Sequence, residues 1–157
     1  MHRWVNSRRK SRVSSAWKST FSTQDEARRH IRVLLGGRAA EELRFGSVGL
    51  GSGGSTQSDL ARATSVATAM IAGHGLGSRL LWLGDADPDT ISAFLRAYPS
   101  LADEVSRLLA VEHEEVMALL RPRVQLINEM ASILVAHGTM IGAEVEELVS
   151  SVRVAQK

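Results

Sequence analysis

The chain has 157 residues, of which 44% are hydrophobic and 23% are charged, a balance typical of one folded domain with a buried core. No window approaches the roughly 18 consecutive apolar residues that a membrane-spanning helix needs. The lack of cysteine excludes disulfides and thiolate metal sites, so any bound metal would need His, Asp or Glu as its protein ligands.

The net charge of +2 is unevenly distributed along the chain. Residues 1–20 carry six basic side chains and no acid, whereas the remaining residues have a net charge of −4. This composition, rich in Arg, Lys and Ser, predicts a disordered, solvated basic arm over residues 1–22. Organelle targeting is an alternative, because transit peptides share this composition. We expect no specific nucleic-acid partner, since a short basic arm would bind phosphate weakly and without sequence preference.

The first predicted helix follows this arm. The letters TQDE form a capping box, in which Thr23 accepts from the amide of Glu26 and the Glu26 side chain reaches back. Apolar residues then recur at helical spacing over 27–43, through the glycine pair 36–37. Because each glycine costs a helix about 1 kcal/mol relative to alanine, we expect the pair to allow close approach of another element.

An irregular glycine-rich loop, residues 46–58, precedes a second predicted helix over 59–72. Three of its glycines have the spacing G-x-G-x-x-G: Gly49, Gly51 and Gly54. That fingerprint requires a preceding strand and an acidic residue about 20 positions later, and the sequence predicts neither, so a flexible or clamping loop is favoured over nucleotide binding. Asp59 stands at the junction, where an acid in the first turn stabilises a helix by about 0.3–1 kcal/mol.

The C-terminal half continues with further helices, the first over 91–97. After Ser100, apolar side chains lie on one helical stripe that is interrupted at Glu112: Leu101, Val105, Leu108, Leu109, Val116, Leu119 and Leu120. Pro122 suits a kink or the first turn of another helix, which runs to Gly138. A last helix follows Thr139, and three of its side chains should face water: Glu144, Glu146 and Glu147. Since no apolar run alternates convincingly, the predicted class is all-α, a helical bundle-like domain over 23–157.

The letters HEEVM, residues 113–117, match half of the zinc-protease pattern H-E-x-x-H. In that pattern two histidines one helical turn apart bind the ion, and the glutamate activates the bound water. His113 and Glu114 fit, but Met117 stands where the second ligand is required. We therefore interpret His113 as a partly exposed helix residue among glutamates and assign no catalytic residue.

Two specific segments, joined by the glycine-rich loop, carry a resemblance: VLLGGRAAEELRFG at 33–46 and SDLARATSVATAMI at 58–71. In this order they closely resemble the peptidase domain of FtsH-type membrane AAA proteases, the ATP-dependent zinc metalloproteases of bacteria, mitochondria and chloroplasts. The segments DEVSRLL, ALLRPRVQLINEMASILV and TMIGAEVEEL resemble the C-terminal helices of that domain. The likeness covers roughly residues 25–149.

The resemblance implies a mostly helical peptidase domain that sits behind a AAA+ ATPase in a hexameric ring. In the family, zinc is held by two histidines of an H-E-x-x-H helix and by an aspartate at the start of the DLxxAT helix, so Asp59 is the implied metal ligand. The resemblance also implies polypeptide substrates, use of ATP through the ATPase module, and membrane anchoring with this domain on the cytoplasmic, matrix or stromal side.

The sequence also departs from the family pattern. It contains no H-E-x-x-H, no ATPase module and no membrane span, and its glycine-rich loop is longer than the family's usual STGASNDL. Two of the three zinc ligands and the general base are therefore absent, whereas a catalytic zinc needs three protein ligands. We expect the C-terminal part of a truncated metalloprotease domain, inactive alone and cytoplasmic. The alternatives are a non-catalytic helical oligomerisation or regulatory module that assembles with full-length protease rings, and a misplaced start codon downstream of an encoded H-E-x-x-H.

Overall fold

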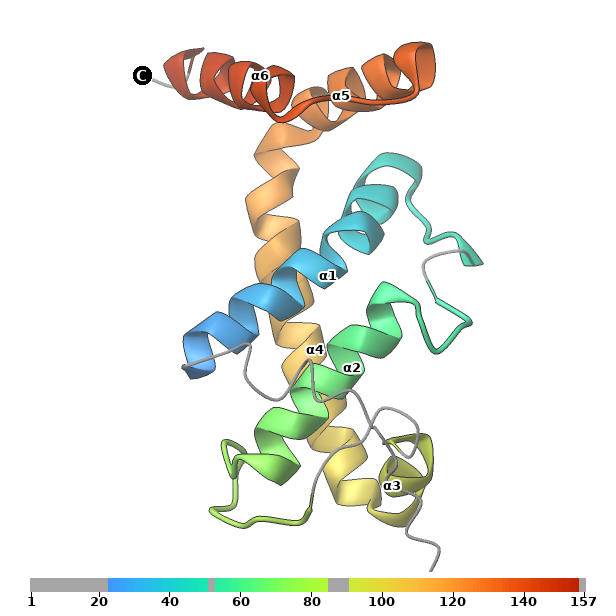
Figure 1. Cartoon of the computed structure of the whole chain (residues 1–157), viewed down its shortest axis with the longest axis vertical. Coiled ribbons are helices and arrows are strands. Elements are labelled where there is room, and N and C mark those ends of the chain that lie inside the picture. Colours follow the sequence, from blue (N-terminus) through green and yellow to red (C-terminus); the bar gives the residue numbers. More distant parts are fainter. Residues whose placement is uncertain (1–22, 51–52, 85–90, 156–157) are drawn as a thin grey trace, which may run out of the picture.

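The computed structural model describes residues 23–50, 53–84 and 91–155, and the predicted basic arm lies outside them (Figure 1). Within these ranges the chain forms helices and loops but no strand, which confirms the all-α class. The elements are α1 (Gln24–Phe45), α2 (Asp59–Thr68), the π-helical turn η2 (Ala69–Gly73), α3 (Ile91–Ala97), α4 (Pro99–Leu120), the 3-10 turn η3 (Arg121–Arg123), α5 (Val124–His137) and α6 (Gly142–Ala155).

Local signals fix both ends of α1. The predicted capping box is present: the Glu26 N–H donates to Thr23 Oγ1 and the Thr23 N–H donates to Glu26 Oε2, each at 3.2 Å. The helix ends at Gly46, whose φ of 66° lies in the left-handed region that glycine adopts readily, and the Gly46 N–H donates to the carbonyl of Glu42.

The core lies where α1, α2 and α4 meet (Figure 1). On α2 its buried residues include the alanines Ala63 and Ala67, and small side chains of this kind let helices pack closely. The other buried members come from α1, η2 and α4: Ala27, Ile31, Leu34, Leu35, Met70, Ile71, Ala72, Leu101 and Val105. The helix predicted over 59–72 thus forms as α2 followed by η2, and it contributes small and apolar side chains to this core.

The predicted stripe on α4 is only partly correct. Val116 is buried in a second small cluster with Ala39 and Met117, but Leu119 is 57% exposed. Glu112, which interrupts the stripe in the sequence, is fully buried instead. The reason is tertiary: two arginines of α1 reach the Glu112 carboxylate and replace its water.

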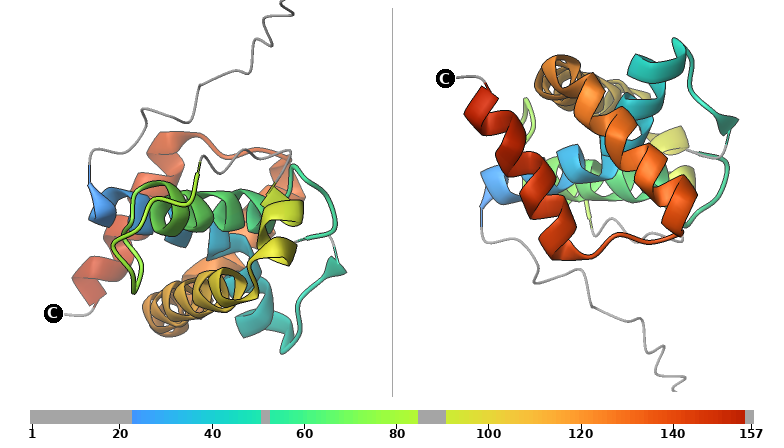
Figure 2. Two further views of the ribbon diagram at one scale, coloured as in Figure 1. Left: turned by 90° about the horizontal axis from the view of Figure 1, so that it is seen from below. Right: turned by 90° about the horizontal axis from the view of Figure 1, so that it is seen from above.

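The helices α5 and α6 form a pair that lies across the far end of α4 (Figures 1 and 2). Among their described side chains only Leu126 is buried, whereas Val135 is 88% exposed. The three predicted acidic side chains of α6 are exposed as expected. No described helix is both long and apolar enough to cross a membrane.

Candidate functional site

Asp59 is the first residue of α2, where the sequence places it. Ser58 caps this helix, because its Oγ accepts the N–H of Ala61 at 3.2 Å. The Asp59 side chain is 60% exposed, and its Oδ1 lies 3.2 Å from Nη1 of Arg62, one turn along the helix. The carboxylate thus meets both the positive end of the helix dipole and a guanidinium group.

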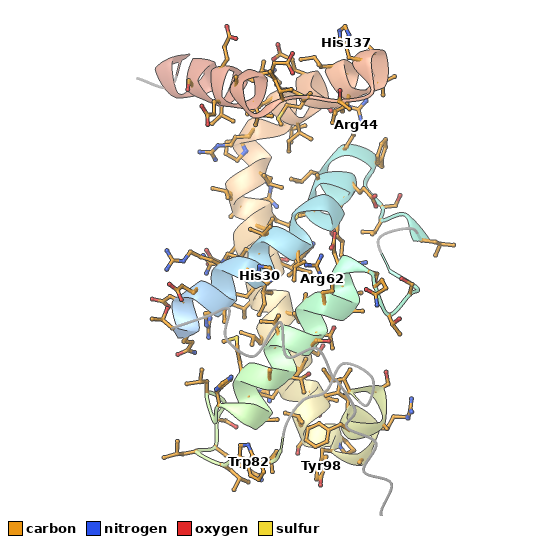
Figure 3. The ribbon with its side chains drawn as sticks, in the orientation of Figure 1. His30, Arg44, Arg62, Trp82, Tyr98 and His137 are labelled. Atoms are coloured by element: carbon orange, nitrogen blue, oxygen red, sulfur yellow. The ribbon has the colours of Figure 1, made fainter. Side chains whose placement is uncertain are left out.

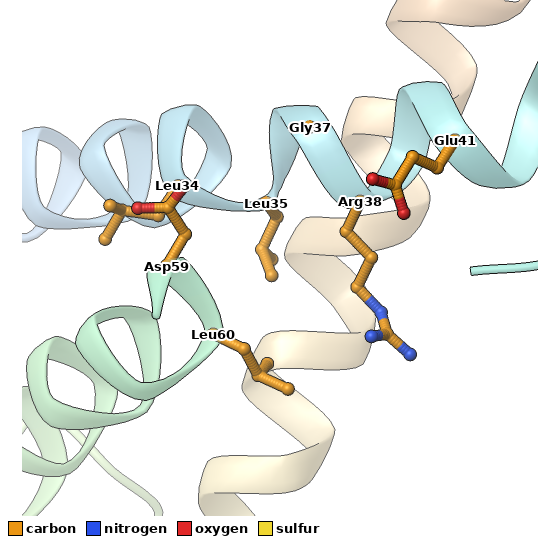
Figure 4. Close-up of a pocket in the computed structure, with 7 residues that line it drawn as sticks. All are labelled: Leu34, Leu35, Gly37, Arg38, Glu41, Asp59 and Leu60. Carbon is orange, nitrogen blue, oxygen red and sulfur yellow. The ribbon is translucent and has the colours of Figure 1, made fainter. Parts of the chain in front are cut away.

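A cavity of about 210 Å³ lies between this helix start and α1 (Figure 4). Its walls combine apolar and charged side chains: Leu34, Leu35, Gly37, Arg38, Glu41, Asp59 and Leu60. Figure 4 shows the Asp59 carboxylate directed towards α1 near Leu34, while Arg38 and Glu41 come from the next turns of α1. The segment LLGGRAAEE and the start of DLARAT, the most specific parts of the resemblance, therefore form one site.

The glycine-rich loop is tied to the same cavity. Oε2 of Glu41 accepts the Gly49 N–H at 2.9 Å, and a Cβ at this glycine would lie only 3.3 Å from that oxygen. This contact supports the interpretation of a clamping loop. Of the glycines that match G-x-G-x-x-G, Gly51 lies outside the described residues.

The glycine pair of α1 has no close neighbour in the described part of the chain. A Cβ built at Gly36 or Gly37 would meet nothing within 4 Å, so no described element packs closely there and the expected close approach of another element stays a prediction. The backbone of α1 is instead left open beside the Asp59 cavity.

The metal-ligating side chains around the Asp59 cavity are too few to hold a zinc ion without further ligands. Among the described residues, no group of three or more His, Cys, Asp or Glu side chains could hold a metal. The cavity offers the carboxylates of Asp59 and Glu41, and each already has a partner, Arg62 and the Gly49 N–H respectively. Because a catalytic zinc needs three protein ligands, the metal role of Asp59 stays a prediction.

His113 lies on α4 with its side chain 18% exposed, and among the described residues it belongs to no group of three metal-ligating side chains. Its Nε2 lies 3.5 Å from Oε2 of Glu42 without a hydrogen bond. Met117, at the position of the missing second ligand, is buried in the small cluster with Ala39 and Val116.

A buried ionic cluster that the sequence pattern did not predict lies between α1 and α4. Nη1 of Arg28 lies 2.8 Å from Oε1 of Glu112, and Nε of Arg32 lies 2.5 Å from Oε2. The hydrogen bond to Glu112 raises the pKa of Arg32 above its ordinary value. The arginines are 84 and 80 positions away from Glu112, so only the break in the apolar stripe hinted at this cluster.

The chain is similar in sequence to known proteins. The family model described as peptidase family M41 matches residues 16–148. It thus begins within the segment predicted as a basic arm. No solved structure gives a significant match.

Several curated relatives are similar to the chain. The ATP-dependent zinc metalloprotease FtsH of Burkholderia pseudomallei is 38% identical over 119 residues, which cover 68% of this chain and 17% of the relative. The ATP-dependent zinc metalloprotease FtsH 2 of Sphaerobacter thermophilus is 33% identical over 125 residues, 78% of this chain and 18% of the relative. The YME1 homolog of Schizosaccharomyces pombe, also an ATP-dependent zinc metalloprotease, is 30% identical over 132 residues, 83% of this chain and 18% of the relative.

The chain spans about a fifth of the length of the curated relatives it matches. The family model nevertheless covers most of this chain, including the two helices that frame the Asp59 cavity. The chain therefore belongs to peptidase family M41 and corresponds to part of an FtsH-type zinc metalloprotease.

Proposed function

We propose that the chain is the C-terminal part of the peptidase domain of an ATP-dependent zinc metalloendopeptidase and that Asp59 is the metal ligand it contributes. The placement of Asp59 carries this proposal: the carboxylate is 60% exposed at the edge of a cavity beside the open glycine pair of α1. A carboxylate in this position can face an element seated on α1. The capped first turn of α2 and the guanidinium of Arg62 hold it there.

Zinc, when bound with its full ligand set, activates water for attack on a peptide carbonyl. The residues of this chain would orient one ligand and leave the other ligands and the general base to a segment bearing H-E-x-x-H. The isolated chain is therefore expected to be inactive. Purified protein should contain no stoichiometric zinc and should not cleave casein. Stoichiometric zinc, or cleavage that a chelator blocks, would overturn the claim of inactivity.

The role of Asp59 can be tested in a chimera. Residues 25–149 of this chain would replace the matching region of the Burkholderia pseudomallei FtsH, and the chimera would first be shown to bind zinc and cleave casein. Asp59→Asn should then lower both the zinc content and the rate of cleavage. Glu41→Gln, in the same cavity, is the matched control and should keep the zinc. An Asp59→Asn chimera with full zinc content and activity would rule out a ligand role.

The proposed partners follow from the same assignment. The substrates would be unfolded or membrane polypeptides, which a AAA+ ATPase module would deliver to the peptidase domain. That module would hydrolyse the ATP, and the subunits would assemble into a ring. The domain would lie on the cytoplasmic, matrix or stromal side of a membrane.

A second candidate function is a non-catalytic helical module that assembles with full-length protease rings. The exposed apolar side chains of α5 and of the loop before α6 favour it: Leu134, Val135 and Ile141. Light scattering after size exclusion, together with co-purification with a full-length relative, distinguishes the two functions. A strict monomer that does not co-purify would count against the module.

A further inference from the structure

The helix pair α5–α6 carries an unbalanced negative charge. Residues 124–150 contain neither Lys nor Arg but include four exposed glutamates: Glu129, Glu144, Glu146 and Glu147. Within the described ranges none of them forms an ion pair. Arg44 of α1 reaches α5 at the side chain of Asn128, which is uncharged. The pair therefore presents a negative surface that attracts positively charged groups.

An open groove of about 310 Å³ lies between α5 and α6. Two of these glutamates, Glu144 and Glu147, line the groove together with the apolar side chains of Ile133 and Leu148. Glu144 also accepts the N–H of Ile141 at 2.8 Å, which fixes its carboxylate at the start of α6. The groove can thus take one large apolar side chain while the carboxylates beside it pair with positive charges.

The other acid-rich helix, α4, is a poorer match for a positive partner. Its acidic residues are Asp103, Glu104, Glu112, Glu114 and Glu115. Arg107 lies among them on the same helix, and Arg28 and Arg32 of α1 pair with the buried one. The Glu104 carboxylate accepts the N–H of Ser78 and, at 3.2 Å, its hydroxyl. A positive segment therefore meets more available carboxylates on α5–α6 than on α4.

A segment with the complementary composition belongs to the same chain. Residues 3–12, outside the described residues, carry no acid and five basic side chains: Arg3, Arg8, Arg9, Lys10 and Arg12. Trp4 stands among them and supplies one large apolar side chain. The match to peptidase family M41 begins only at residue 16, so the family assignment gives this segment no role.

The segment is long enough to reach the groove. The start of α1 is joined to α4 where Arg28 pairs with Glu112, and seen from above α6 passes over the N-terminal half of α1 (Figure 2). From Thr23, through this contact and along α4 and α5 to Ile133, the path is about 50 Å at about 1.5 Å per helical residue. The chain between Trp4 and Thr23 spans up to about 65 Å when extended. Because the segment is tethered, its effective concentration at the groove is on the order of millimolar, so weak contacts are sufficient.

We propose that residues 3–12 dock on the pair α5–α6 of the same molecule, with Trp4 seated in the groove and the basic side chains against the glutamates of α6. This contact uses neither the Asp59 cavity nor a metal, so it does not depend on the function proposed above.

The fluorescence of Trp4 in the full chain tests this placement. Trp17→Phe and Trp82→Phe leave Trp4 as the only tryptophan. Figure 3 shows Trp82 at the opposite end of the molecule from α5 and α6, so its replacement does not alter the groove. We expect acrylamide, a neutral quencher, to quench Trp4 at least threefold less in the chain than in the free peptide of residues 1–15. Sodium chloride at about 1 M should remove most of this protection, because the Debye length is then about 3 Å. Equal quenching in chain and peptide would overturn the proposal.

Charge reversal on α6 tests the surface. Glu146→Lys/Glu147→Lys should raise the quenching of Trp4 to the level of the free peptide, because it repels the basic segment. Glu114→Lys/Glu115→Lys on α4 is the matched control: it changes an adjacent exposed pair by the same charge and should keep the protection. Loss of protection in both variants would overturn the assignment to α5–α6. Circular dichroism checks that both variants keep the helix content of the parent.

The groove and the intramolecular contact have their own measurements. Leu148→Ser should raise the quenching of Trp4 at least twofold, whereas Val135→Ser, an exposed position of the same pair outside the groove, should not. Equal quenching in these two variants would contradict seating in the groove. Protection should not depend on protein concentration. Protection that rises with concentration, together with a dimer in light scattering, would overturn the proposal, because the segment would then dock on a second copy of the chain.

Discussion

Glu112 is a carboxylate with no exposed side-chain surface, and each of its oxygens accepts from a different arginine of α1. Removing a carboxylate from water is costly unless its charge is paired and hydrogen-bonded. Arg28 and Arg32 are 34% and 40% exposed, so their guanidinium groups keep some contact with water. Loss of the arginines and loss of the carboxylate should therefore affect stability unequally.

The double variant Arg28→Ala/Arg32→Ala leaves Glu112 buried and uncompensated. We expect it to lower the free energy of unfolding by about 3–5 kcal/mol. Glu112→Gln should cost less, because the arginines can still reach water. Arg29→Ala, on the exposed side of α1, is the control and should change stability by no more than about 0.5 kcal/mol. Urea unfolding followed by circular dichroism measures all three; an equal loss for the double variant and Glu112→Gln would contradict this account.

The hydrogen bond to Glu112 is the largest cause of the raised pKa of Arg32. The direction of this pKa shift decides how the titration of Arg32 changes the stability of the fold with pH. A base whose pKa is higher in the folded state stabilises the fold fully below its unfolded pKa, and this stabilisation is lost as pH rises through the folded value. That window is strongly alkaline, so the titration of Arg32 itself should leave stability unchanged near neutral pH.

Two glycines should respond to alanine with opposite signs. Gly77→Ala places a Cβ 2.7 Å from Cγ2 of Ile71 and displaces Glu104 from Ser78, so we expect a loss of about 1–3 kcal/mol. Gly36→Ala meets nothing within 4 Å and improves helix propensity, so we expect a gain of about 0.5–1 kcal/mol. Thermal unfolding compares the two variants with the parent. Destabilisation by Gly36→Ala in the isolated chain would show that α1 is covered there.

At the scale of single elements, the sequence predicted the helices well because their signals are local. The capping box of α1, the 3.6-residue periodicity and the glycine after α5 all act within a few residues, and the predicted short helix 91–97 matches α3. The π-helical end of α2 and the exposure of Leu119 depend on the neighbouring helices, so the pattern of one helix could not show them. The candidate site shows the same division: the motif alone placed Asp59 at the start of α2 and its metal role stays a prediction, whereas the arginines that pair with Glu112 lie in another helix.

The start of α2 provides a prediction about the isolated chain. Ser58→Ala removes the cap and should lower the free energy of unfolding by about 1 kcal/mol. Asp59→Asn loses the interaction with the helix dipole, worth about 0.3–1 kcal/mol.

Neither zinc nor EDTA should shift the melting temperature, because the described residues offer no set of three ligands. A shift with zinc that Asp59→Asn abolishes would show that this chain binds the metal alone.

At the scale of the whole molecule, burial is concentrated in the packing of α1, α2 and α4. The pair α5–α6 is joined to α4 through η3 and touches α1 near the side-chain hydrogen bond between Arg44 and Asn128. With only Leu126 buried among its described side chains, this pair has little to stabilise it beyond its own helical hydrogen bonds.

Hydrogen exchange of backbone amides should show that the pair α5–α6 opens more readily than the core helices. Amides of α5 and α6 should exchange faster than those of α1 and α4, because opening the pair exposes little further apolar surface. Exchange measured by mass spectrometry at two protein concentrations also detects assembly, since protection of α5 and α6 that rises with concentration would indicate that copies of the chain cover them. Equal protection of all four helices in a dilute monomer would contradict the prediction.

The ion pairs from α1 to Glu112 join residues 84 and 80 positions apart, which matters while the chain is being made. Synthesis proceeds from the N-terminus, so α1 and α2 leave the ribosome before α4 exists, and their shared apolar face stays open during that time. Arg28 and Arg32 border this face with positive charge, which disfavours its association with apolar segments of other nascent chains. An mRNA truncated before the codons of α4 would therefore encode a polypeptide that exposes this apolar face. Chaperones would bind that polypeptide and proteases would degrade it, because it cannot form a smaller stable domain.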